Sequence, residues 1–226
     1  MATAAGPTRV YLDTPFLIQA NKPDILHGSN IEVFNSTASV LVDYQDEIPD
    51  PNHTDDWVNF SFVWNNDTGQ DAEINTEALL VVKGEADCFA HAGHIPVIDE
   101  AGSSLIWIAQ LQILEMWNQP PTSPIPEADQ TVLILDGPFA LDMSTGLFDS
   151  GDHQVIDVFQ AYPLAHRTFL TVPRNGSLVF QVSLNIGSTL FGGGWCTSNL
   201  SPTAPGGFVL CPFVELQVST SGIMTN

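Results

Sequence analysis

Apolar and polar residues alternate along several segments of this chain, and this period of two restricts its fold more than any other feature. In 177–186 (SLVFQVSLNI) every even-numbered residue is apolar, and Val179 is the only apolar residue at an odd-numbered position. The segment 57–64 and the second half of 208–218 alternate in the same way. Successive side chains of a strand point to opposite faces of a sheet. The alternation therefore predicts strands with one buried face and one solvent-exposed face.

The rest of the chain adds further strand-like segments, separated by predicted turns that are rich in Gly and Pro or, as at Asn66–Gly69, contain Asn, Asp and Gly. Strands are predicted at 8–13, 31–35, 37–44, 74–83, 104–114, 130–136, 154–160 and 167–172. The segment 105–117 contains no Gly or Pro and could also form a helix, but its β-branched and aromatic residues favour a strand. With 16 Pro and 17 Gly, the chain has few stretches that could form a long helix.

Roughly ten strands at close spacing, without alternating helices, predict an all-β fold. We expect an antiparallel β-sandwich of jelly-roll type with little helix, folded as a single domain over residues 1–226. The proline-rich segment 119–126 is predicted to be a long loop of this sandwich or a hinge within it.

The chain is strongly acidic because cations are scarce: 5 Lys and Arg stand against 26 Asp and Glu, for a formal net charge of -21. So few cations cannot neutralise phosphates, so we expect no direct contact with nucleic acid or with an anionic membrane surface. No apolar run approaches the roughly 18 residues of a spanning helix. The first residues, MATAAGPTRV, lack the pattern of a signal peptide. Scarcity of Lys and Arg fits either a high-salt habitat or exposure to trypsin-like proteases.

Cys88, His91 and His94 lie within seven residues (CFAHAGH) and are the candidate metal ligands of the chain. Cys and His at this spacing can hold zinc, with a nearby carboxylate as a fourth ligand. The alternative interpretation is one buried cysteine followed by two loop histidines, and on that basis we expect no cofactor. Cys196 and Cys211 could form a disulfide or stay reduced.

No motif in the sequence indicates an enzyme. The nucleophile pattern G-x-S-x-G is missing, and no spacing couples His153 or His166 to a nucleophile. Asn-x-Ser/Thr triplets, which are glycan acceptors only in a secreted eukaryotic protein, begin at Asn35, Asn52, Asn59, Asn66, Asn175 and Asn199. We expect a protein that binds rather than one that catalyses a reaction.

Tryptophans supply the candidate contact residues. Trp57, Trp107, Trp117 and Trp195 could form a ligand platform or anchor an interface between protein copies, or they could pack in the core. The leading hypothesis is a structural protein of an ordered assembly, most specifically a viral capsid or decoration protein on a virion or extracellular surface, whose partners are copies of itself or other assembly proteins. The alternatives are a carbohydrate-binding β-sandwich and a metal-dependent enzyme centred on His91 and His94.

Overall fold

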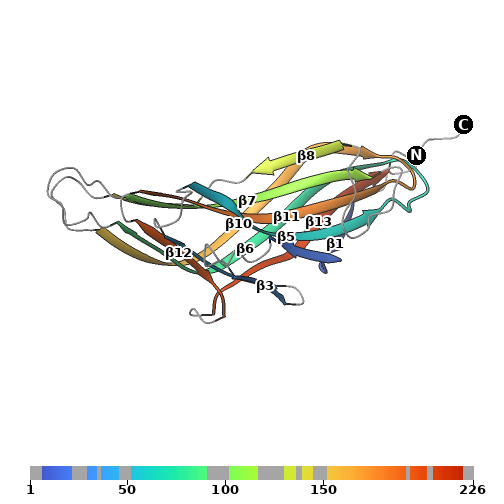
Figure 1. The fold of residues 1–226 in the computed structure, drawn as a ribbon. Helices are drawn as coiled ribbons and strands as arrows, with labels where there is room; N and C mark the ends of the chain where they lie inside the picture. The colour runs from blue at the N-terminus through green and yellow to red at the C-terminus, as the bar shows by residue number, and fades with distance from the viewer. Residues whose placement is uncertain are drawn as a thin grey trace, which may run out of the picture.

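The computed structural model describes residues 7–21, 30–34, 37–45, 52–90, 102–116, 130–135, 139–144, 152–191, 194–202 and 206–220. These residues form thirteen β-strands and no helix. The strands make two sheets, called sheet A and sheet B, in which every pairing is antiparallel (Figure 1). The predicted all-β sandwich is therefore confirmed.

Sheet A contains seven strands. They are β1 (Thr8–Leu12), β3 (Asn30–Phe34), β4 (Thr37–Gln45), β6 (Ala72–Ala90), β10 (Asp152–Val172), β12 (Trp195–Leu200) and β13 (Phe208–Thr220). Sheet B contains six strands. They are β2 (Leu17–Ala20), β5 (Asn52–Asn65), β7 (Gly102–Met116), β8 (Gln130–Leu135), β9 (Phe139–Ser144) and β11 (Ser177–Phe191).

The long strand β6 organises sheet A. One of its edges pairs with β10 along its whole length. Its other edge is shared, because β13 pairs with residues 72–83 and β12 pairs with residues 85–89. In sheet B, β11 lies between β5 and β7, and β7 pairs in turn with β8 and β9.

The core lies between the two sheets, where the predicted alternation places the apolar side chains. Along β6 every second residue is buried, and one hydrophobic cluster contains side chains from both sheets. Among its largest members are Trp107, Phe60, Phe62 and Phe180, none of which exposes measurable surface. Burying one such aromatic side chain stabilises the fold by about 2–3 kcal/mol. Aromatic side chains of β5, β7 and β11 therefore supply a large part of the core that sheet B packs against sheet A.

Several predicted strands are confirmed, and others have different limits. The segment 105–117, which allowed a helix or a strand, is the strand β7 up to Met116. The segments 154–160 and 167–172 are one continuous strand, β10, because a proline such as Pro163 is tolerated in an edge strand. Strands β2, β9 and β12 are short and were not predicted.

The strand β6 is longer than its sequence pattern suggested. The predicted strand 74–83 extends through Ala90, so Cys88 lies inside it. The possible loop or hinge at 119–126 lies outside the described residues. No described segment forms a helix with the length and apolar character that crossing a membrane requires.

Candidate functional site on the outer face of sheet A

The outer face of sheet A is the side turned away from sheet B, and its side chains come mainly from β6, β10 and β13. On β6 these are the half-buried or exposed odd-numbered residues that alternate with the buried even-numbered ones. Partners in neighbouring strands share a face, so the register places these side chains in rows across the sheet. Three successive rows are mostly apolar.

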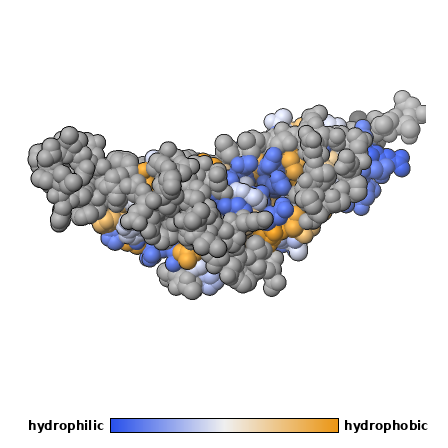
Figure 2. Space-filling view, in the orientation of Figure 1, coloured by the Kyte–Doolittle hydropathy of each residue, from blue (hydrophilic) through white to orange (hydrophobic). Residues whose placement is uncertain are grey.

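The apolar band is the set of residues in these rows. Phe208, Lys83 and Phe159 form the first row; Leu210, Val81 and Ala161 form the second; Phe213, Leu79 and Pro163 form the third. Phe159 exposes 73% of its surface, the largest value among the exposed large hydrophobic residues. Figure 2 views the molecule from another side, where hydrophobic and hydrophilic residues lie side by side near its middle. Ala161 and Pro163, beside Phe159 on β10, are also exposed, whereas the apolar members on β6 and β13 are half-buried. Exposed apolar patches of this kind are typical of contact sites.

Two irregularities in the strands shape this face. At Cys211–Pro212 the strand β13 has one residue more than β6, which turns Phe213 back to the outer face. The bulge accommodates Pro212, which has no N–H to donate to the ladder. The strand β10 forms an edge of sheet A, and Pro163 in this strand has no backbone N–H to donate. Prolines in edge strands hinder pairing with a strand of another molecule. A partner would therefore contact the face of the sheet more readily than its edge.

Most of the chain's cations lie on this face. Arg9, Lys83 and Arg167 are three of its five Lys and Arg residues. Lys83 lies in the first row of the apolar band. Arg9 Nη1 lies 3.1 Å from Glu215 Oε1, and the pKa of Arg9 is raised by its interactions with Tyr11 and Glu215. The same face also carries carboxylates, because Glu77, Glu85 and Asp87 of β6, Asp157 of β10 and Glu215 of β13 point to it as well, so Lys83 is a local positive charge on a face that is acidic elsewhere.

An aromatic cluster lies at the other end of the same face. Trp195, Phe89 and His153 form one row across β12, β6 and β10. The rings of Trp195 and Phe89 are stacked with centroids 5.6 Å apart, and the ring of His153 lies edge-on to Phe89 at 5.6 Å. His153 Nε2 is 2.8 Å from Asp87 Oδ1. This arrangement orients the imidazole and presents a partly exposed indole.

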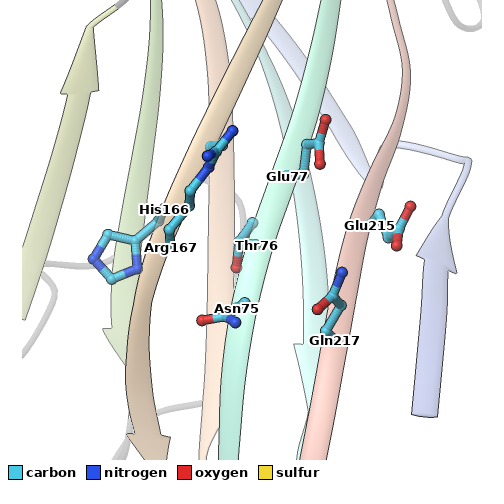
Figure 3. Close-up of a pocket in the computed structure, with 8 residues that line it drawn as sticks. Asn75, Thr76, Glu77, His166, Arg167, Glu215 and Gln217 are labelled. Atoms are coloured by element: carbon cyan, nitrogen blue, oxygen red, sulfur yellow. The ribbon is translucent and has the colours of Figure 1, made fainter. Parts of the chain in front are cut away.

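A polar pocket of about 270 Å³ opens beyond the apolar band, near the bulge in β10 (Figure 3). Regular pairing of β10 with β6 ends at His166–Thr76 and resumes at Leu170–Ile74. In between, three residues of β10 face the single residue Asn75 of β6, and the strands separate there. The lining residues are Asn75, Thr76, Glu77, Ala165, His166, Arg167, Glu215 and Gln217.

Buried polar atoms at this pocket lack hydrogen-bond partners among the described residues. They are Asn75 Oδ1, Thr76 Oγ1 and His166 Nδ1. Buried polar atoms without partners cost free energy, commonly about 1–3 kcal/mol each. Figure 3 shows Asn75 and Glu77 on β6, Gln217 and Glu215 on β13, and Arg167 on the β6 side of β10, whereas the ring of His166 projects to the other side of β10. The pocket can offer both donors and acceptors to a small polar ligand.

The four predicted tryptophan contact residues have different environments. Trp107 is fully buried between the sheets because odd-numbered residues of β7 face inward, so it is a core residue and cannot serve as a platform. Trp195 lies half-buried on the outer face of sheet A. Trp57 is half-buried in β5, where its backbone N–H donates to Asn21 Oδ1 at 3.0 Å. Trp117 lies outside the described residues.

Of the predicted metal ligands, the structure describes only Cys88. Its side chain is fully buried and its Sγ lies 2.9 Å from Cys196 Sγ, a contact that together with burial raises the pKa of Cys196. His91 and His94 lie outside the described residues. Within the described part of the chain, no three His, Cys, Asp or Glu side chains are grouped closely enough to hold a metal ion.

Sequence reasoning did not find the grouping of Trp195, Phe89 and His153, because these residues come from three strands that are far apart in the chain. His153 follows Asp152 in the sequence, yet its partner is Asp87 of the neighbouring strand. A search of protein-family models, of curated proteins and of solved structures found no match to this chain.

Proposed function

We propose that this protein is a non-enzymatic structural component of an ordered assembly, a viral capsid or decoration protein on a virion or extracellular surface, acting through protein–protein contacts. The observation that carries the proposal is the apolar band on the outer face of sheet A, with Phe159 exposed by 73%. We take the partner to be a second copy of this chain. A chain of net charge -21 repels its own copies over most of its surface, and the three rows of the apolar band contain Lys83 and no carboxylate.

The strand connections support the jelly-roll form of the proposal. In chain order, the main segments are β4, β5, β6, β7, β8 with β9, β10, β11, and β12 with β13. The outermost segments of this series pair with each other, and so do the segments successively further in. Thus β4 pairs with β12, β5 with β11, β6 with β10, and β7 with β8 and β9. This order is that of one long antiparallel hairpin rolled into two sheets, which is how a jelly roll of eight strands is wound. Viral shell domains commonly have this form, although the form alone does not define a function.

The apolar band and Lys83 suit contact with the acidic surface of another copy. Apolar side chains at the centre of an interface supply most of the affinity, while charge complementarity guides the encounter. Because the band and the complementary acidic surface are different parts of the chain, such a contact would be heterologous. Heterologous contacts build rings or extended arrays, as an ordered shell requires.

The first prediction concerns self-association, measured by sedimentation velocity and negative-stain imaging over a range of protein concentrations. We expect the wild-type chain to associate, and Phe159→Ser to weaken association about tenfold to thirtyfold, which corresponds to the loss of one anchoring aromatic side chain. Lys83→Glu should also weaken association, because it places a carboxylate against an acidic partner. Both residues lie on the surface of a strand, so the urea midpoint should change little.

Two matched controls test whether the location of these residues matters. Phe16→Ser removes an exposed aromatic residue between β1 and β2, away from this face, where Phe16 is 40% exposed. Arg174→Glu changes the net charge by the same amount as Lys83→Glu but lies in the turn between β10 and β11. Both controls should associate like the wild type. A wild-type chain that stays monomeric at high concentration would contradict the proposed assembly function. Equal effects of Lys83→Glu and Arg174→Glu on association would contradict the assignment of the contact to the apolar band.

The polar pocket favours a second candidate function, carbohydrate binding. The orphaned Asn75 Oδ1, Thr76 Oγ1 and His166 Nδ1 could pair with ligand hydroxyls, and the amides and carboxylates nearby are suitable partners for a sugar. The second prediction is binding on a glycan array that is lost in Asn75→Ala and in Arg167→Ala but retained in Arg174→Ala. An array without any signal, or binding that survives both pocket substitutions, would argue against this candidate.

A further inference from the structure

Two cysteines that are far apart in the sequence face each other in sheet A. Cys88 of β6 and Cys196 of β12 are register partners, their Sγ atoms lie 2.9 Å apart, and both side chains are fully buried. Opposite residues of antiparallel strands have Cα atoms about 4.5–5.5 Å apart, which falls within the range of about 4.4–6.8 Å that a disulfide spans. The backbone is therefore already placed for a covalent bond.

We propose that Cys88 and Cys196 are the site of a disulfide that joins β6 to β12 when the chain folds in the presence of a low-molecular-weight disulfide such as oxidised glutathione. One cysteine thiolate attacks oxidised glutathione, releasing one glutathione thiolate and leaving a mixed disulfide. The other cysteine then displaces the second glutathione. The two cysteines are oxidised by two electrons and release two protons, and oxidised glutathione is reduced to two glutathione thiols.

The third cysteine stays a free thiol in this proposal. Cys211 lies in the β13 bulge, which faces β6 near Leu80, whereas Cys196 lies opposite Cys88. Eight residues of strand separate these two positions, or about 26 Å, which is too far for a bond between Cys196 and Cys211. Once the chain has folded, burial also raises the pKa of Cys211 to about 12, so this thiol does not react further.

The bond would close a long loop, because β7 to β11 lie between its two ends in the sequence. Restricting a loop of this length in the unfolded chain raises the melting temperature, in the chain-entropy picture, by roughly 10 °C for a chain of this size. The buried sulfurs would also be sheltered from reductants in the folded state. We therefore expect the bond to form during folding and, once formed, to be reduced slowly unless the protein is unfolded.

The test is to refold the full chain in a buffer containing both reduced and oxidised glutathione and, in parallel, with reductant alone. Free thiols are then alkylated in denaturant, and the peptides are mapped by mass spectrometry without reduction. The expected result is one alkylated residue, Cys211, one cross-linked peptide pair containing Cys88 and Cys196, and a melting temperature that is higher than in the reduced sample. The variant Cys211→Ser should retain the same cross-link and melting shift.

Three outcomes would overturn the proposal. The first is three alkylated cysteines after oxidative refolding to a native fold, and the second is a cross-link that contains Cys211. The third is a pair of glutathione adducts on Cys88 and Cys196 in place of a bond between them. Because these readouts do not depend on association, they leave the assembly proposal to its own test.

Discussion

At the scale of single residues, Asn66 has a role that its sequence context does not reveal. It begins an Asn-x-Thr triplet in a predicted turn, yet its side chain is only 1% exposed. Its Nδ2 donates to the carbonyl oxygens of Gln70, Val172 and Pro173 at 2.8, 3.0 and 3.1 Å. Its Oδ1 accepts from Thr68 Oγ1 at 2.7 Å. Asn66 thus ties the β5–β6 turn to the end of β10, and in the folded chain its amide is not free to carry a glycan.

The residue-scale prediction is that Asn66→Ala lowers the free energy of unfolding by about 2–3 kcal/mol, because it leaves several carbonyl groups without a donor in a buried place. Asn66→Asp should cost at least as much, since a carboxylate would replace the donating amide among the same carbonyls. Urea unfolding followed by circular dichroism measures both values. Asn59→Ala, on a half-buried polar position of β5, is the matched control and should change stability by about 0.5 kcal/mol or less. Similar effects at the two sites would contradict the structural role.

At the scale of the strand, Gly84 explains how β6 can pair with two strands along one edge. It lies between residue 83, the last partner of β13, and residue 85, the first partner of β12. Its φ is +155°, and a Cβ atom added there would meet the carbonyl oxygen of Asn199 and lie 2.9 Å from Leu200 Cα. Both contacts are with backbone, which cannot move aside as a side chain can. The close approach of β12 to β6 therefore requires glycine.

The prediction at this scale is that Gly84→Ala destabilises the protein by about 3 kcal/mol, through a steric conflict in a buried strand. Gly69→Ala is the control, because Gly69 has φ +81° but no atom within 4 Å of its added Cβ. Gly69→Ala should lower the free energy of unfolding only by the cost of a positive φ for a residue with a Cβ atom, about 1 kcal/mol. Equilibrium unfolding in denaturant measures both changes in free energy, from the shift of the midpoint when the dependence of the free energy on denaturant concentration is unchanged. A Gly84→Ala protein as stable as Gly69→Ala would show that β12 can shift away from β6.

At the scale of the whole molecule, charge and topology act together. A net charge of -21 keeps copies of the chain apart over most of their surface. Rolling the strands into two sheets gathers Arg9, Lys83 and Arg167 onto one face, together with carboxylates such as Glu77, Glu85 and Asp157 and next to apolar side chains that the core does not use. The outer face of sheet B differs, because the described side chains of β5, β7 and β11 that point there, such as Asn59, Gln110, Gln181 and Asn185, are uncharged. The association that we propose through the outer face of sheet A would thus be a property of the folded chain and not of its composition.

The sequence by itself determined the fold class, because alternating polarity reports which side of a strand is buried, and this holds for every strand independently of its neighbours. The turn at Asn66–Gly69 was also visible, since its residues favour a turn locally. The tertiary structure alone decided the site. Trp195, Phe89 and His153, like Cys88 and Cys196, meet only through the register of strands that lie far apart in the chain. Register depends on long-range packing and on bulges such as that at Cys211–Pro212, and no local pattern specifies either.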